Sequence, residues 1–133
     1  MKTLTRFVGL VLLVLALALN SQSVARNIPF VAAFSPLNSM AYPFSGEMQL
    51  NFNRGIISGT YSDTSIRPGG PLRNRRNVAI TGGMDDQGNI HLSIGPMRVR
   101  GTLDGQWISG TATVDRRMFT FRARQGAPGQ PAQ

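Results

Sequence analysis

The fold is decided by residues 97–124, which read MRVRGTLDGQWISGTATVDRRMFTFRAR. Through this stretch, apolar or small residues alternate with arginine, threonine and serine, and a period of two is typical of half-buried β-strands. Two turn signals interrupt the alternation: Asp104-Gly105, a strong hairpin sequence, and Asp115. The stretch therefore predicts three antiparallel strands that follow one another along the chain.

The same alternation recurs on the N-terminal side, and helical periodicity is absent after residue 25. Further inward-facing rows are predicted at Met48–Phe52, Ile57–Tyr61, Val78–Ile80 and Ile90–Ile94. Strands joined in sequence by tight turns form a meander, and a meander removes its exposed edges by closing on itself. We therefore predict an all-β protein, a small antiparallel meander that forms a closed or nearly closed β-barrel of about six to eight strands.

The N-terminus has the layout of a secretory signal peptide. Lys2 and Arg6 precede the apolar run Phe7–Leu19, and Ser23-Val24-Ala25 supplies the small residues of a cleavage site. A transmembrane helix needs about 20 apolar residues, so this run is too short to span a bilayer. We expect residues 1–25 to be removed, leaving no membrane span, and the mature protein to be exported to the periplasm or the medium.

The mature chain divides into three parts. Residues 26–43 are interrupted by Pro29, Pro36 and Pro43, although Ile28–Phe34 could add an edge strand that completes the barrel. Residues 44–124 form the predicted barrel domain. Residues 125–133 are polar and rich in glycine and proline, and we expect a disordered tail there.

Composition excludes several kinds of chemistry. The 133 residues include 14 Lys+Arg, 6 Asp+Glu, one histidine and no cysteine, which leaves no disulfide, thiol nucleophile or His-cluster zinc site. Four of the carboxylates fall in predicted turns: Asp85, Asp86, Asp104 and Asp115. His91 and Ser93 lie two apart on one strand, about 6–7 Å between Cα atoms, which is too far for a direct hydrogen bond. We predict no enzymatic activity, no metal site and no cofactor.

Arginine supplies every cation after residue 25, and its planar fork of donors suits phosphate, sulfate and carboxylate groups. The first arginine group lies in the stretch Ser62–Arg76, around Pro68-Gly69-Gly70-Pro71, and consists of Arg67, Arg73, Arg75 and Arg76. Because like charges repel, we expect this long loop to stay open until an anion binds. The alternative is a solvated loop with no ligand.

The second arginine group depends on the register of the last three strands. With four-residue turns, Leu103 pairs with Ile108 and Val114 pairs with Phe119. Three outward rows then follow: Arg100–Thr111–Arg122, Thr102–Ser109–Arg124 and Arg98–Thr113–Thr120. This face would present arginine forks among hydroxyl groups to an anion. The alternative is an ordinary outer face that only keeps the sheet in water.

The same register predicts an inner row of small residues at Gly101, Gly110 and Ala123. Such a row leaves a trough, which either another element fills or a small ligand occupies. We favour close packing, with Ile28–Phe34 as the candidate element, because a void would cost stability.

The leading functional hypothesis is a non-catalytic binding module for an anionic polymer or an acidic protein surface. Its predicted anion-binding residues are Arg98, Arg100, Arg122, Arg124, Thr111 and Ser109, helped by the four loop arginines. One alternative is a barrel that binds a small apolar ligand in its interior. Another is an inhibitor that inserts its Pro-Gly-Gly-Pro loop into a partner protein. Nucleic acid is not expected, because no row of aromatic residues accompanies the arginines.

Overall fold

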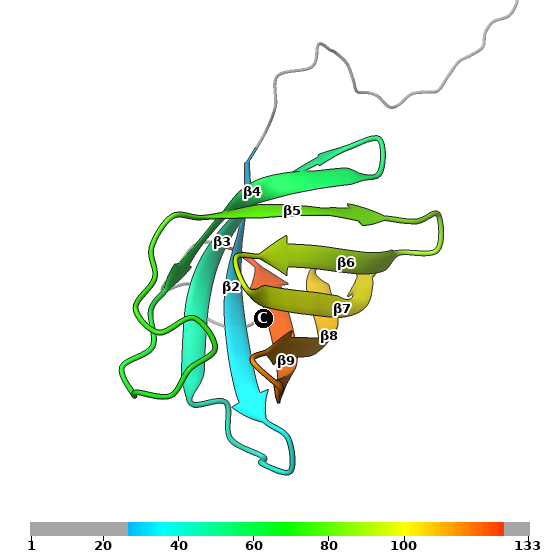
Figure 1. The fold of residues 1–133 in the computed structure, drawn as a ribbon. Helices are drawn as coiled ribbons and strands as arrows, with labels where there is room; N and C mark the ends of the chain where they lie inside the picture. The colour runs from blue at the N-terminus through cyan, green and yellow to red at the C-terminus, as the bar shows by residue number, and fades with distance from the viewer. Residues whose placement is uncertain (1–26, 127–133) are drawn as a thin grey trace, which may run out of the picture.

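The structure is a computed structural model that describes residues 27–126. Within these residues, eight antiparallel strands form a closed barrel in which each strand pairs with the next and β2 pairs with β9 (Figure 1). The strands are β2 (Ile28–Pro36), β3 (Phe44–Asn53), β4 (Ile56–Asp63), β5 (Val78–Met84), β6 (Asn89–Ile94), β7 (Met97–Asp104), β8 (Trp107–Val114) and β9 (Arg117–Gln125). The predicted meander barrel is confirmed, and the structure closes it.

The strand that closes the barrel comes from the proline-interrupted segment. β2 pairs with β3 on one side and with β9 on the other, so it is a full member of the sheet. The barrel therefore begins at Ile28 rather than at Phe44, because closure needs a partner for the free edges of β3 and β9. The predicted signal peptide, residues 1–25, and tail residues 127–133 lie outside the described residues.

The barrel interior is filled by the predicted inward rows together with aromatic side chains of β2, β3, β4 and β9. Phe34 lies at the centre of an aromatic cluster, with ring centroids 5.2 Å from Phe121 and 6.1 Å from Tyr61. Phe119 lies within 6.4 Å of the Phe34 ring and within 6.0 Å of the Phe44 ring. The centre of the barrel is thus a packed hydrophobic core.

The hairpin between β8 and β9 differs from the prediction. Val114 pairs with Arg117 rather than with Phe119, because Asp115 and Arg116 alone form the loop. Both residues have positive φ, 49° and 67°, as a two-residue type I′ turn requires. The predicted register places a four-residue turn here, as at Asp104, whereas the loop between the paired residues Val114 and Arg117 has two residues. The shift of two residues changes the cross-strand partners and leaves each side chain on its predicted face.

The predicted trough is wrong for the same reason. Gly101 does lie opposite Gly110, but the third member of the row is Phe121 instead of Ala123. A Cβ atom added to Gly110 would lie 1.9 Å from the Arg100 carbonyl oxygen and 2.5 Å from the Gly101 Cα atom. The two glycines therefore mark a close approach of β7 and β8, and a large ring fills the space beside them.

Because the strands form a meander, their connections alternate between the two ends of the barrel. One end, here called the long-loop end, carries residues 37–43, 64–77, 95–96 and 115–116. The other, the short-turn end, carries residues 54–55, 85–88 and 105–106. In Figure 1 the β2–β3 and β4–β5 loops extend at the bottom and lower left, and the short turns at β3–β4 and β5–β6 lie on the right.

Candidate anion-binding end of the barrel

The long β4–β5 loop is held to the barrel by one buried carboxylate. Asp63, 5% exposed at the end of β4, accepts hydrogen bonds from the Ser65 amide at 3.1 Å and the Asn74 amide at 2.7 Å. The Asp63 amide in turn donates to the Arg75 carbonyl oxygen at 2.8 Å. One side chain thus joins the start of the loop to its end.

Contacts with β3 and with the core fix the rest of the loop. The Ser65 hydroxyl donates to the Ser45 carbonyl oxygen at 3.1 Å and accepts from the Ser45 amide at 2.9 Å. Leu72 is 1% exposed and belongs to the hydrophobic core, so the loop covers this end of the barrel. The expectation of a loop that stays open is wrong, because backbone hydrogen bonds and burial of Leu72 outweigh repulsion between exposed arginines.

Within this folded loop the four predicted arginines remain exposed. Arg67 and Arg73 line a hollow of about 300 Å³, together with Pro68, Gly69, Gly70, Asp63 and Asn74. Arg75 lies beside the β6–β7 turn, since a Cβ atom on Gly95 would be 3.7 Å from its Nη1 atom. The loop therefore presents cationic groups around a concave surface without having to open.

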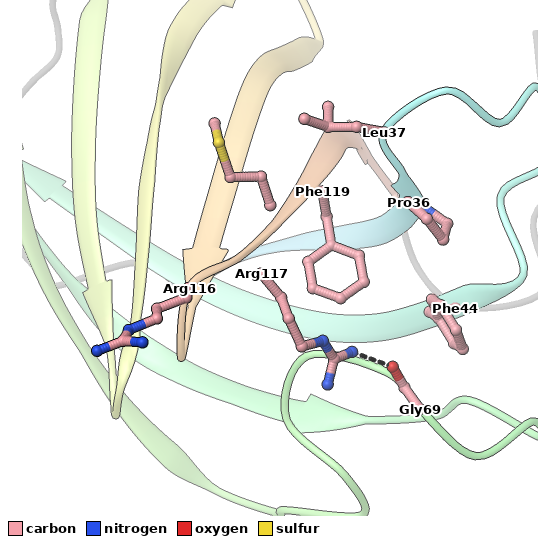
Figure 2. Close-up of a pocket in the computed structure, with 8 residues that line it drawn as sticks. Pro36, Leu37, Phe44, Gly69, Arg116, Arg117 and Phe119 are labelled. Carbon is pink, nitrogen blue, oxygen red and sulfur yellow. Dashed lines mark hydrogen bonds between the residues drawn. The ribbon is translucent and has the colours of Figure 1, made fainter.

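The β8–β9 turn adds Arg116 and Arg117, which the sequence analysis did not select. The Arg117 guanidinium donates to the Gly69 carbonyl oxygen of the β4–β5 loop, and its Cζ atom lies 4.9 Å from the centroid of the Phe119 ring (Figure 2). Hydrogen bonding and the cation–π contact hold this cation at the junction of two connections. Topology could have indicated this neighbourhood, because alternate hairpin loops of a meander meet at one end.

Charge is distributed unequally between the two ends. The long-loop end carries the arginines Arg67, Arg73, Arg75, Arg76, Arg116 and Arg117 and the aspartates Asp63 and Asp115. Asp63 is buried, with its oxygens engaged by loop amides, so Asp115 is the exposed acid of these connections. The short-turn end carries Arg54 and Arg124 with Asp85, Asp86 and Asp104. The long-loop end is therefore the cationic end of the barrel.

The outer face of β7–β9 is also assembled, although with different rows from those predicted. The observed rows are Arg100–Thr111–Thr120, Thr102–Ser109–Arg122, Asp104–Trp107–Arg124 and Arg98–Thr113–Met118. Arg122 therefore lies beside Ser109 rather than in the Arg100 row. His91 of β6 lies opposite Arg100 and is exposed, as predicted.

Three of the four sheet arginines already have contacts within the protein. Arg98 donates to the Gly95 carbonyl oxygen at 2.9 Å, and Arg124 donates to the Gln125 carbonyl oxygen at 3.4 Å. The Arg122 Cζ atom lies 4.7 Å from the centroid of the Tyr42 ring and 5.3 Å from that of Trp107. Arg100 is the sheet arginine with the most freedom to bind a ligand.

Other candidate groups have structural roles. Asp85 holds the β5–β6 turn. It accepts hydrogen bonds from the Asn89 side-chain amide at 2.8 Å and from the Asn89 and Gln87 backbone amides at 2.9 and 2.8 Å, and these bonds, the side-chain one above all, lower its pKa. The Tyr61 hydroxyl is buried and has no hydrogen-bond partner among the described residues, and burial together with the nearby Asp63 charge raises its pKa. Residues 27–126 contain no group of three histidine or acidic side chains that could hold a metal ion.

The geometry does not favour the two alternative functions. Large buried side chains fill the centre of the barrel, and the apolar pocket of about 500 Å³ that Phe44 and Phe119 help to line opens at the long-loop end instead. Gly70 and Pro71 of the Pro-Gly-Gly-Pro sequence are buried against the barrel, whereas an inhibitory loop must be free to enter a partner.

Comparison of the chain with protein-family models, with curated proteins and with solved structures finds no match. Among residues 27–126, no helix is long and apolar enough to cross a membrane.

Proposed function

We propose that this chain is an exported, non-catalytic binding module that recognises an anionic envelope or extracellular partner through surface arginines. The observation that carries the proposal is the gathering of exposed arginines from the β4–β5 loop and the β8–β9 turn at one end of the barrel. Guanidinium groups bind phosphate, sulfate and carboxylate oxygens through paired hydrogen bonds.

The long-loop end is the primary site in this proposal, and the outer face around Arg100 extends it. Arg67 and Arg73 share a hollow of the β4–β5 loop, and all four loop arginines are exposed to solvent. Arg98 and Arg122, in contrast, are engaged by a turn carbonyl group and by aromatic rings. These differences favour the loop arginines over the sheet arginines as the main contact.

The test is binding of the mature protein to dextran sulfate and to polyphosphate over a series of salt concentrations. Two variants remove the same charge: one replaces Arg67, Arg73, Arg75 and Arg76 with Gln, and the other replaces Arg98, Arg100, Arg122 and Arg124 with Gln. We expect the loop variant to lose about tenfold or more in affinity at low salt, and the sheet variant to lose less. Thermal unfolding of both variants confirms that the barrel persists.

Loss of binding in the sheet variant alone would overturn the assignment to the long-loop end and place the site on the outer face. Equal loss in both variants would show that only net charge acts. No binding by the wild-type protein to either polymer would contradict the proposed function itself.

A further inference from the structure

The long-loop end also exposes large apolar side chains, which anion binding alone does not explain. Met40 of the β2–β3 loop is 97% exposed and Ile66 of the β4–β5 loop is 98% exposed. Ile66 immediately precedes Arg67, so an apolar tip and a cation are neighbours in the chain. At the short-turn end, Ile56 and Trp107 lie beside turns and are less exposed, at 65% and 37%.

An apolar pocket of about 500 Å³ opens at the same end, between the β2–β3 loop and the β8–β9 hairpin. Phe44, Phe119 and Leu37 belong to its lining (Figure 2). Met118 lines it as well, and both Leu37 and Met118 are nearly half exposed. Arg117 lines the pocket as well, with its guanidinium bonded to Gly69. Apolar surface and fixed positive charge therefore occur together.

We propose that the long-loop end docks on the surface of an anionic lipid bilayer, an inference that rests on the proposed function and names its partner. Met40 and Ile66 enter the interfacial region, and the surrounding arginines contact lipid phosphate groups. Burial of apolar side chains and attraction of basic groups to anionic lipids are the two contributions that bind peripheral proteins to membranes.

Apolar burial and charge attraction together favour a bilayer over a soluble polyanion as the partner. A sulfated or phosphorylated polymer would satisfy the arginines but would leave Met40 and Ile66 in water. An acidic protein surface could cover them only by offering apolar pockets matched to two separate loops. A bilayer interface accepts apolar tips at any lateral position, and this fits side chains carried on two different loops.

The test is co-sedimentation with vesicles of phosphatidylcholine, alone or mixed in equal parts with phosphatidylglycerol. The double variant Met40→Ser, Ile66→Ser keeps all charges, and Ile56→Ser is the matched control at the short-turn end. We expect binding only to the anionic vesicles, reduced about tenfold or more in the double variant and unchanged in the control. Binding of the double variant to dextran sulfate should remain at the wild-type level.

A second measurement locates the contact directly. The chain has no cysteine, so Ile66→Cys and Ile56→Cys can each carry a single environment-sensitive fluorophore. On anionic vesicles, the emission of the label at residue 66 should shift to shorter wavelength, and that of the label at residue 56 should not.

The outcomes separate the two proposals. Wild-type binding to dextran sulfate without binding to anionic vesicles would overturn the bilayer inference, leave the proposed function standing and favour a soluble polyanion or acidic protein. Vesicle binding that the double variant retains, with no change at the residue 66 label, would also overturn it. Failure to bind either the polymer or the vesicles would remove the proposed function as well.

Discussion

At both ends of the barrel the chain reverses direction between neighbouring strands, but the connections at the two ends differ greatly in length. The short-turn end uses residues 54–55, 85–88 and 105–106, and Asp85 shows how local hydrogen bonds suffice there. The long-loop end uses residues 37–43 and 64–77 in addition to two short turns. Hairpin closure does not require those extra residues, so another role has to explain them.

Some residues of the long β4–β5 loop stabilise the fold, and others are free to bind a partner. Asp63 and Leu72 face the barrel and fix the loop, whereas the loop arginines and Ile66 face solvent. A long loop can therefore be ordered by a few inward residues while its outward residues remain free to contact a partner.

The largest effect is expected for Asp63→Ala. The substitution removes a buried carboxylate that accepts two loop amides, and it should lower the free energy of unfolding by about 3 kcal/mol. Urea unfolding followed by circular dichroism measures this change. Asp86→Ala, in an exposed turn at the other end, is the control and should change stability little. If both substitutions lowered the free energy of unfolding equally, the Asp63 carboxylate would not be the group that anchors the loop.

Leu72→Ala should lower the free energy of unfolding by about 2.5 kcal/mol, because it removes a buried side chain that covers the core. Leu37→Ala, at the exposed rim of the same end, should cost much less. Chemical denaturation of both variants provides the comparison. If Leu72→Ala left the free energy of unfolding unchanged, the β4–β5 loop would not unfold cooperatively with the core.

Tyr61→Phe should stabilise the protein by up to about 1 kcal/mol, because it removes a buried hydroxyl group that lacks a hydrogen-bond partner. The raised pKa of Tyr61 adds a dependence on pH. Above the ordinary tyrosine pKa of about 10, the unfolded chain loses its proton first, so wild-type stability should fall as pH rises there. Unfolding midpoints at neutral and alkaline pH should show this fall for the wild type and a smaller fall for Tyr61→Phe.

Asp85→Ala should have the smallest effect, a slight loss of stability at neutral pH, since the side chain is fully exposed. Its lowered pKa means that the hydrogen bonds of the turn contribute above the ordinary aspartate value and are lost as pH falls through the folded value. Unfolding midpoints of variant and wild type should therefore converge as the pH falls below the ordinary aspartate value. A difference that persists in acid would contradict this role.

The period-two pattern was sufficient to predict the barrel and the facing of its strands. Side chains such as Leu92, Val99 and Phe121 are buried as expected, because burial on one face of a sheet depends on alternation alone. The register of β8 and β9 was not predictable in the same way. It depends on positive φ at Asp115 and Arg116. A glycine would have indicated positive φ at this turn, but aspartate and arginine do not.

The candidate site was predictable only in part. The loop arginines could be selected because they cluster in sequence, whereas Arg116 and Arg117 join them only through the folded topology. The anchoring role of Asp63 depends on amides from opposite ends of the loop, and no local pattern indicates it. In the folded β4–β5 loop, backbone hydrogen bonds and the burial of Leu72 outweigh repulsion between the arginines, and the sequence alone does not show these contacts.

Anion binding at the long-loop end can be tested residue by residue by titrating the ¹⁵N-labelled mature protein with sucrose octasulfate, a small polyanion, and following the amide chemical shifts. We expect the largest shifts at residues 64–76 and 116–117, and we expect them to decrease as salt is added. Shifts confined to the short-turn end, or to the outer face around Arg100 and Thr111, would contradict binding at the long-loop end.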